Sequence, residues 1–502
     1  AAYAANTAGT ITGLGNENVT ITGTTVATLA ELKAINNATS GTITLNAQSI
    51  SADYSGVVAD VKAAFAGITT QTGKITLTDA SVSVADINTV AGVTSGEVTA
   101  TVTSAAASVL NALTTTSTDA ITMTVNAEAA SAATQASDLV SLNGKTNKAI
   151  TMTAVTSVSG SYADLLDVYV TNAAQYNGEG DEAVTITGTV TATQADAIAD
   201  VTSGVVTATI NADTAAALNA ALTNATPTDA LTLTINDTSL TSVSDLLALD
   251  GKTNVAVNAS SVNSITDTYT NLNSVYAANT AGTISGLGDE NIFISNIGTI
   301  ASSQITSLDA ATTGTVTLSG AGSLTLTTIA GETLDLSGVT NSLSGTLSIT
   351  DSTGNETITG TSANDTLTLS SGNDTINLGN GSDTINATIG NLNVNDNISD
   401  TGSTGTDVLN ITNSGTIDSA NLIDAKGIET LNLSSGNDTI TVGTGNAKIN
   451  AGKGFDNITL GLGDHEIKFH TNDAKELYTT ITGVNTKDKI IFDESNLLFN
   501  KK

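Results

Sequence analysis

The chain of 502 residues has no cysteine, no tryptophan and no arginine, and it contains a single proline, Pro227. Without cysteine there can be no disulfide, no thiolate metal site and no thiol nucleophile. An exported protein of this length must then be stabilised by buried apolar surface, by backbone ladders or by metal. One proline and 45 glycines are not typical of a linker-rich or disordered chain.

Positive charge is also scarce, with 15 basic residues against 48 acidic ones and a net charge of -33. This balance argues against nucleic acid or an anionic membrane as partner, because both would be repelled. It favours cations, although a solvated acidic surface explains the charge equally well. No apolar run approaches the roughly twenty residues that span a bilayer, so no transmembrane segment is expected. The first residues show no charged region followed by an apolar one, so no signal peptide is visible.

The first two-thirds of the chain repeat with a period of about 108 residues. The clearest markers are glycine-rich acidic turns, of which the last two are 108 residues apart: Gly13-Leu14-Gly15-Asn16-Glu17, Gly178-Glu179-Gly180-Asp181-Glu182 and Gly286-Leu287-Gly288-Asp289-Glu290. They are interpreted as turns and not as nucleotide loops, because no further glycine follows at the required spacing and a strand comes next. An additional cation at their acidic residues is an alternative. Tyr3 to Gly9 repeats Tyr276 to Gly282, in mid-repeat, which predicts further repeats upstream.

Each long repeat divides into about four units, and each unit joins an alternating segment to a short alanine-rich one. The alternation predicts strands near residues 19–22, 43–45, 75–78, 98–102, 121–125 and 150–153. The alanine-rich segments predict short helices at 27–35, 57–68, 137–142, 213–222 and 242–249. In the segment 213–222, Asp213 is the expected N-cap, and Leu218 and Leu222 fall on one face.

A unit of strand, turn, short helix and turn cannot bury its faces alone, so the units are expected to stack. We therefore predict a repeat solenoid over residues 1–325, right-handed, β-rich and parallel, with strands on one side and short helices or tight turns on the other. The competing interpretation is an all-β helix in which the alanine-rich pieces are only turns.

A second, shorter repeat follows near the C-terminal end. Glu356, Asp365, Asp374 and Asp383 are each nine residues apart, and the pattern returns at Asp438 and Asp456. Glycines precede each acid and an apolar residue follows two positions later. Two nine-residue units make one coil, so carboxylates eighteen apart should stack about 4.8 Å from one another and repel. A hard cation with oxygen ligands removes that repulsion, which predicts calcium. The alternative is a β-solenoid whose turns merely prefer Asn, Asp and Gly.

The predicted calcium ligands come from the acids and glycine-rich turns of these units. They are Asp365, Gly372, Asn373, Asp374, Gly379, Gly381, Asp383, Gly436, Asn437, Asp438, Gly452, Gly454 and Asp456. Ala447 and His465 stand where an aspartate is expected, so their units should bind weakly, although Asp464 could replace His465. His465 and His470 are expected at the edge and exit of the repeat, and a zinc pair is a minor alternative because no third ligand is visible.

The segments Gly379-Asn380-Gly381-Ser382-Asp383-Thr384-Ile385 and Gly452-Lys453-Gly454-Phe455-Asp456-Asn457-Ile458 resemble the RTX nonapeptide of type I-secreted bacterial proteins. The resemblance implies a calcium-binding parallel β-roll. It gives four regions: the solenoid 1–325, a transition 326–353, the roll 354–470 with a strand-rich insertion 389–433, and 471–502, which resembles a secretion-signal region. The long Ala- and Thr-rich repeats resemble those of bacterial surface-layer proteins and RTX adhesins.

These resemblances imply a secreted protein of the bacterial cell surface or extracellular space. We expect a self-assembling structural subunit of a surface layer or fibre, with calcium-dependent folding, whose partner is another copy of itself. An RTX adhesin that binds cells, biofilm or cell-surface polysaccharide is the alternative. A secreted enzyme with an RTX tail is less expected, because the sequence lacks a His-Glu-x-x-His helix, a Gly-x-Ser-x-Gly elbow and a cysteine nucleophile.

Overall fold

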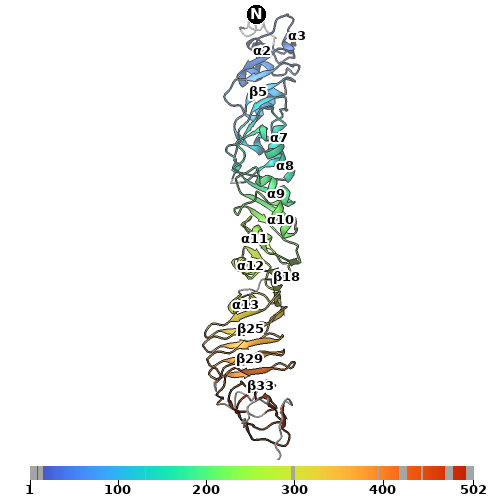
Figure 1. The fold of residues 1–502 in the computed structure, drawn as a ribbon. Coiled ribbons are helices and arrows are strands. Elements are labelled where there is room, and N and C mark those ends of the chain that lie inside the picture. The colour runs from blue at the N-terminus through green and yellow to red at the C-terminus, as the bar shows by residue number, and fades with distance from the viewer. Residues whose placement is uncertain are drawn as a thin grey trace, which may run out of the picture. The chain divides into compact units, whose positions relative to one another are not determined.

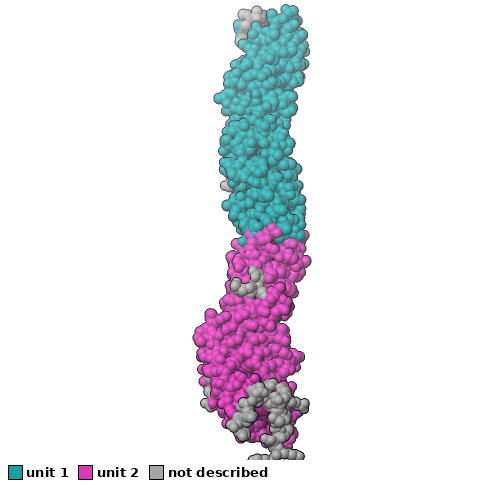
Figure 2. Space-filling view, in the orientation of Figure 1, with its two compact units in different colours: residues 1–234, 248–257 teal, residues 235–247, 258–502 magenta. Residues whose placement is uncertain are grey.

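The computed structural model describes residues 8, 15–129, 132–295, 300–392, 395–417, 427–442, 445–469 and 479–492. The chain forms two compact units, which Figure 2 colours separately. Unit 1 comprises residues 1–234 and 248–257, and unit 2 comprises residues 235–247 and 258–502. Among the described residues, no helix combines the length and the apolar character needed to cross a membrane. The four-region division made from the sequence stays a prediction.

Unit 1 contains short strands that pair in parallel with the strand of a neighbouring repeat unit, as in the pairs Ile75↔Val98 and Val184↔Val206. Its larger sheets have the orders β3-β4-β5-β7 and β15-β14-β13-β11-β9, and its two-stranded ones are β1-β2, β6-β8 and β10-β12. The strands are β1 (Val19–Thr20), β2 (Ile43–Thr44), β3 (Tyr54–Gly56), β4 (Ile75–Leu77), β5 (Val98–Thr101), β6 (Ala105–Ala106), β7 (Ala120–Thr122), β8 (Val125–Asn126), β9 (Thr134–Gln135), β10 (Ile150–Thr151), β11 (Ser157–Gly160), β12 (Tyr176–Asn177), β13 (Ala183–Val190), β14 (Val206–Ile210) and β15 (Ala230–Thr232).

Between these strands lie short helices, many of which contact the next one along the chain (Figure 1). They are α2 (Leu29–Asn36), α3 (Ala47–Ile50), α4 (Val58–Phe65), α5 (Val84–Ala91), α6 (Ala107–Leu110), α7 (Ala136–Asn143), α8 (Tyr162–Leu166), α9 (Ala192–Ala199) and α10 (Ala215–Ala221), with the π-helix η2 (Asp167–Thr171) and the 3-10 turn η3 (Ala173–Gln175). The alanine-rich segments are therefore helical, and the all-β interpretation is wrong. Capping boxes at Thr28 and Thr191 begin α2 and α9.

One detail of the helix prediction is wrong. The N-cap of α10 is Thr214, whose hydroxyl accepts the Ala217 N–H at 3.2 Å. The Asp213 carboxylate instead accepts the N–H of Thr214 at 2.8 Å. Thr214 is still in the extended conformation, so the helix begins one residue later than predicted. Leu218 and Leu222 are both buried, as their spacing predicts.

The acidic turns of the long repeat act as hydrogen-bond acceptors for their own loops. Glu290, which is fully buried, accepts the Gly288 N–H at 2.8 Å and the Tyr276 hydroxyl at 2.8 Å. Glu182 accepts the Gly180 N–H at 2.8 Å, and its second oxygen has no partner within the described residues. Burial, together with the hydrogen bond to Glu290, raises the pKa of Tyr276. These contacts give the turn glutamates a structural role.

Unit 2 begins with a mixed region of strands and helices. Its five-stranded sheet has the order β16-β18-β20-β21-β24. The elements are β16 (Ser239–Leu240), β18 (Ser264–Asp267), α12 (Tyr269–Ala281), β19 (Ile284–Ser285), β20 (Asn291–Ile294), α13 (Ser302–Asp309), β21 (Val316–Gly320) and β24 (Val339–Leu343). Two further elements, α11 (Ser244–Asp250) and β17 (Val257–Asn258), contain residues assigned to both units.

In the remainder of unit 2 the described residues form strands and no helix, and the strands lie in three parallel sheets. The nine-stranded sheet holds β22 (Leu324–Thr327), β25 (Leu347–Thr350), β27 (Asp365–Thr368), β29 (Thr384–Ala387), β31 (Val408–Ile411), β33 (Thr430–Asn432), β35 (Lys448–Asn450), β37 (Glu466–Phe469) and β39 (Lys489–Phe492). One four-stranded sheet holds β23 (Thr333–Asp335), β26 (Thr357–Thr359), β28 (Thr375–Asn377) and β30 (Asn397–Ser399). The other holds β32 (Thr416–Ile417), β34 (Thr439–Thr441), β36 (Asn457–Thr459) and β38 (Thr480–Thr482).

From β25 onward, strands that follow one another along the chain alternate between sheets, and each pairs with a strand two steps away; β22 and β23 pair with β25 and β26, three steps away, because β24 belongs to the five-stranded sheet. The pairs Leu347↔Asp365 and Thr357↔Thr375 are eighteen residues apart, so two nine-residue units form one coil, as predicted. The apolar residues of these units, such as Ile358, Leu367 and Ile376, are fully buried between the sheets. In Figure 1, β25, β29 and β33 lie one above another. This region is a parallel β-roll.

The insertion at 389–433 continues the sheets of the roll. Its strands β30 and β31 pair with β28 and β29 through Thr375↔Asn397 and Thr384↔Val408. These coils are 22 and 24 residues long instead of eighteen. The extra residues extend the turns and leave the strand register intact.

Candidate metal sites

The acids of the nine-residue repeat stand in columns, each at the residue that begins a strand of the roll or directly precedes it. Beside the nine-stranded sheet the column reads Asp365, Asp383, Asp407, Glu429, Ala447, His465 and Asp488. Beside the four-stranded sheets the columns contain Glu356, Asp374 and Asp396, and then Asp438 and Asp456. The parallel register therefore brings the predicted acids together coil upon coil.

A repeated hydrogen bond ties each coil to the next within these columns. The backbone N–H of one acid donates to a carboxylate oxygen of the acid on the following coil. The donor–acceptor distances are 2.9 Å for Glu356 to Asp374, 2.7 Å for Asp365 to Asp383, 2.8 Å for Asp383 to Asp407 and 3.0 Å for Asp438 to Asp456. Each such bond uses one carboxylate oxygen and leaves the other to be satisfied in another way.

Three acids of the columns keep one carboxylate oxygen without a hydrogen-bond partner within the described part of the chain: Glu356 Oε2, Asp374 Oδ2 and Asp383 Oδ2. The three residues are at most 2% exposed, so water cannot solvate them freely. A buried, unpaired carboxylate oxygen is costly unless a cation or a proton reaches it.

The acid–base properties of the columns reflect this shortage of partners. Burial raises the pKa of Asp374 and Asp383 to about 7, and neighbouring carboxylates add to the effect. Burial likewise raises the pKa of Asp365, Asp407 and Asp456 to about 6. Backbone hydrogen bonds oppose the shift in each case. The columns thus hold several acids that are unstable as neighbouring anions, and a bound cation would restore their charged form.

The glycine-rich turns that precede the acids lie directly against main-chain oxygens of the preceding coil. A Cβ on Gly381 would lie 2.7 Å from the Ala363 carbonyl oxygen, and one on Gly454 would lie 2.1 Å from the Gly436 oxygen. Both glycines have φ values, 140° and 134°, that side chains rarely adopt. The predicted turn residues Gly372, Gly379, Gly436 and Gly452 belong to the same stacked turns. Carboxylate and carbonyl oxygens together make the all-oxygen donor set that suits calcium.

The predicted acids do not all need a metal to the same degree. Asp365 accepts the Thr361 N–H at 2.7 Å and the Thr361 hydroxyl at 3.0 Å. Asp438 accepts the Ser434 N–H at 3.1 Å and its hydroxyl at 2.9 Å. In both units a hydroxyl residue replaces a glycine of the motif and satisfies the carboxylate. Asp374 has Ser370 at the same position, but the Ser370 N–H donates to Asp351 at 3.1 Å. Asp383 has Gly379 there, which has no hydroxyl.

The predicted asparagines use their side chains elsewhere. The Asn437 side-chain oxygen accepts the Phe455 N–H at 2.8 Å, one coil later. The Asn373 side-chain oxygen accepts a hydrogen bond from Asn395 at 3.4 Å. Their side chains therefore link coils, and what they can offer to a metal is the main-chain carbonyl.

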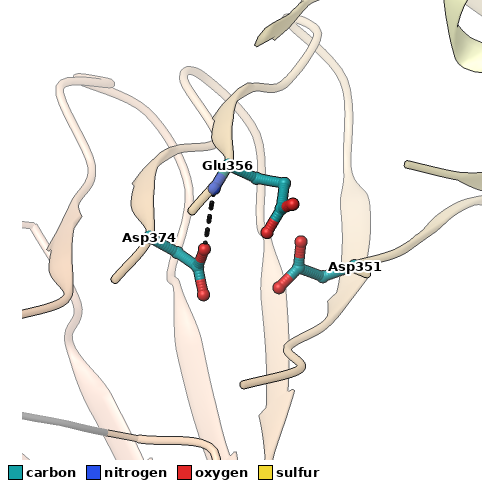
Figure 3. A group of neighbouring side chains, drawn as sticks. All are labelled: Asp351, Glu356 and Asp374. Carbon is teal, nitrogen blue, oxygen red and sulfur yellow. Dashed lines mark hydrogen bonds between the residues drawn. The ribbon is translucent and has the colours of Figure 1, made fainter. Parts of the chain in front are cut away.

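The sequence analysis missed one member of the site. Asp351, Glu356 and Asp374 form a buried group in which one oxygen of each lies within 4.8 Å of the others. Figure 3 shows the three carboxylates directed toward one another. Asp351 occupies the first position of its nine-residue unit, where the motif has glycine, and this substitution is the signal that could have identified it. Asp407 and Glu429 were missed because the insertion breaks the nine-residue spacing.

His465 occupies an aspartate position in the column, buried between Ala447 and Asp488. Its backbone N–H donates to Asp488 at 2.8 Å, and neither ring nitrogen has a partner among the described residues. The half-exposed side chain of Asp464 pairs with Lys487 at 3.7 Å, and its replacement of His465 as a ligand stays a prediction. His470 lies outside the described residues, so the zinc pair stays a prediction.

Comparison with known proteins identifies the repeat. Residues 350–385 and 426–464 match the family model of the RTX calcium-binding nonapeptide repeat (4 copies). Searches of curated proteins and of solved structures gave no match. RTX nonapeptide repeats bind calcium and are typical of secreted proteins, and the oxygen-rich, partly unpaired donor set described above fits that ion. The matched segments support an RTX-type protein whose C-terminal region is a calcium-binding parallel β-roll.

Proposed function

We propose that the chain is an exported structural subunit of a bacterial surface layer or extracellular fibre, and that calcium controls the folding of its roll. The observation that carries the proposal is the set of buried carboxylate oxygens without partners at Glu356, Asp374 and Asp383. In the roll these oxygens belong to acids stacked coil upon coil, which makes the roll dependent on a cation. In the repeats of unit 1, protein donors satisfy both oxygens of Asp119 and Asp229, although Glu182 also keeps one oxygen without a partner among the described residues.

The mechanism follows from the columns of acids. In the calcium-poor interior of a cell, the carboxylates of neighbouring coils repel, and the roll stays open enough to be exported as an extended chain. Bound calcium supplies positive charge and oxygen coordination to the stacked turns. Because the ion binds the folded roll and not the unfolded chain, the roll becomes stable at the millimolar calcium concentrations outside cells.

Repetition supports a structural role. A chain of similar units presents similar surface groups at a regular interval, which suits contacts repeated along a lattice or filament. The proposal includes no enzymatic activity, since the sequence contains none of the nucleophile or zinc motifs considered above. Export by a type I system, directed by the region 471–502, is part of the proposal and rests on the resemblance of that region.

The test is electron microscopy of the purified chain, combined with light scattering, in millimolar calcium and after chelation. Periodic sheets or filaments that form with calcium and disperse with chelator are expected. Monomers of unchanged size in both conditions would contradict the assembly role.

Adhesion is the second candidate. It is favoured by rows of exposed hydroxyls, such as Thr101 on β5 and Thr122 on β7, which pair directly across neighbouring strands. Such rows could bind cell-surface polysaccharide. Calcium-loaded monomers that bind cells or glycan arrays without forming periodic assemblies would favour this function over the first.

A further inference from the structure

The group Asp351, Glu356 and Asp374 lies where the nine-residue repeats begin. Asp351 directly follows β25, Glu356 directly precedes β26, and Asp374 directly precedes β28, the parallel partner of β26. Two of the acids thus flank a single turn, and the third comes from the next coil. Their facing oxygens lie within 4.8 Å of one another (Figure 3).

Protein donors satisfy only part of this group. Asp351 accepts the Ser370 N–H at 3.1 Å and, more distantly, the Thr328 hydroxyl at 3.4 Å. Glu356 Oε1 accepts the Gly331 N–H at 2.7 Å and the Ser352 hydroxyl at 2.9 Å. Asp374 Oδ1 accepts the Glu356 N–H at 2.9 Å.

Two oxygens then remain, Glu356 Oε2 and Asp374 Oδ2, and neither has a partner within the described residues. Their residues are 1% and 0% exposed. The ion pairs found in the described part of the chain lie elsewhere, so no lysine there balances the three charges. Three buried carboxylates with two open oxygens are a ligand set for a hard divalent cation.

The preceding coil shows why the site begins here. Glu332 is in register with Glu356 in the same column, through the pair Thr333↔Thr357. Its two oxygens accept the Ser302 hydroxyl at 2.6 Å and the Ile329 N–H at 2.8 Å. Protein donors therefore satisfy both oxygens of the acid one coil earlier. Glu356 is the first acid of this column that needs a cation.

The following units show why this site differs from the others. The pair Asp365 and Asp383 offers two carboxylates, and Thr361 already satisfies Asp365. The pair Asp438 and Asp456 is similar, with Ser434 satisfying Asp438. In calcium sites, affinity rises with the number of charged ligands when the ligands are held in place.

We infer that Asp351 adds a third carboxylate to the repeat acids Glu356 and Asp374, that the three form a calcium site at the N-terminal boundary of the roll, and that this site fills at the lowest calcium concentration. Filling this site first fixes the register between the coil that needs no metal and the coils that do. The inference rests on the calcium-dependent roll of the proposed function and not on the assembly role.

The experiment titrates the full chain, stripped with chelator, with calcium alone, using calorimetry and native mass spectrometry to count bound ions. In Asp351→Asn, which keeps an oxygen to accept the Ser370 N–H, the tightest binding step should weaken at least tenfold. In the matched control Glu332→Gln, in the same column one coil earlier, that step should stay within twofold of the parent. A tightest step within twofold of the parent in Asp351→Asn would overturn the inference.

A second measurement needs no variant. Hydrogen exchange of the parent chain, followed along the same titration, should show peptides that contain residues 351–374 becoming protected at lower calcium than peptides that contain 438–456. Simultaneous protection, or the reverse order, would overturn the inference. Failure of the chain to assemble in the microscope would affect neither measurement, so the two proposals can fail separately.

Discussion

The repeats of unit 1 and the roll of unit 2 both place aspartates at the edges of parallel coils, but they satisfy them differently. Asp229 accepts the Val206 N–H at 2.7 Å with one oxygen and the Thr226 N–H at 2.7 Å with the other. Asp119 makes the same contacts with Val98 and Thr116. In the roll, Asp383 accepts one backbone N–H, and its second oxygen has no partner in the described residues.

The difference teaches that an acid at a coil edge does not by itself indicate a metal site. What decides is whether the neighbouring turn offers a second donor. A threonine three residues before Asp229 supplies it, and within the roll Thr361 and Ser434 do the same for Asp365 and Asp438. At Asp374 the corresponding Ser370 donates to Asp351 instead, and at Asp383 the position is a glycine, so one oxygen of each carboxylate is left for calcium.

The largest effect should come from removing unpaired acids of the roll. In Asp374→Asn/Asp383→Asn, the calcium-dependent stabilisation of the roll should fall by about 3 kcal/mol or more, since one site held at about 100 times its Kd contributes about 2.7 kcal/mol. Urea unfolding in millimolar calcium, followed by circular dichroism, measures the loss. A double variant that unfolds with the parent in calcium would show that these acids do not hold the ion.

The matching change in unit 1 should be smaller and indifferent to calcium. Asp229→Asn presents an amide to the Thr226 donors and removes their hydrogen bonds to a charged carboxylate, at a cost of about 1.5–3 kcal/mol. The same urea experiment should give equal losses in calcium and in chelator. A loss confined to the calcium sample would mean that unit 1 also depends on the ion.

The stability of the roll should depend on pH in opposite directions without and with calcium. Burial raises the folded-state pKa of Asp374 and Asp383 to about 7, above an unfolded value of about 4. Protonation therefore favours the folded roll, and this contribution is fully present below about pH 4 and lost as the pH rises through about 7. In chelator the roll should melt at a higher temperature at pH 5 than at pH 8. In calcium the order should reverse, because protons compete with the ion; a chelated roll that is more stable at pH 8 would contradict this.

The smallest effect should come from the asparagine ladder of the nine-stranded sheet, which links coils without metal. The Asn432 amide donates to Asn410 at 2.7 Å, and Asn410 donates to Asn386 at 2.8 Å. Asn432→Ala should cost about 0.5–1.5 kcal/mol per lost bond in urea unfolding at millimolar calcium, and the number of calcium ions counted by native mass spectrometry should not change. A lower number of bound ions would show that the ladder and the metal sites are coupled.

The architecture of the roll could be predicted from the sequence, because it follows from the spacing of residues that are near one another in the chain. The spacing of Glu356 and Asp374 by eighteen residues predicts that they stack, and their strands pair in that register. The alternation near Val98 and the alanine-rich segment near Leu218 likewise predict a strand and a helix, and both are observed.

The sequence could not show which carboxylate oxygens receive hydrogen bonds, because many of the donors come from other coils. Asp351 joins Glu356 and Asp374 only once the coils are stacked. Asp407 enters the column through a coil of 24 residues, whose length hides the repeat. Asp213 was preferred over Thr214 as N-cap because both residue types cap helices, and only the backbone conformation distinguishes them.

The central claim is that calcium holds the roll together while unit 1 folds without it. Peptide-resolved hydrogen exchange of the full chain, with calcium and after chelation, tests this most directly. Peptides from the roll between residues 350 and 469 should lose their protection in chelator, and peptides from residues 132–234 should keep it. Roll peptides that stay protected in chelator, or a loss of protection in both regions together, would contradict the claim.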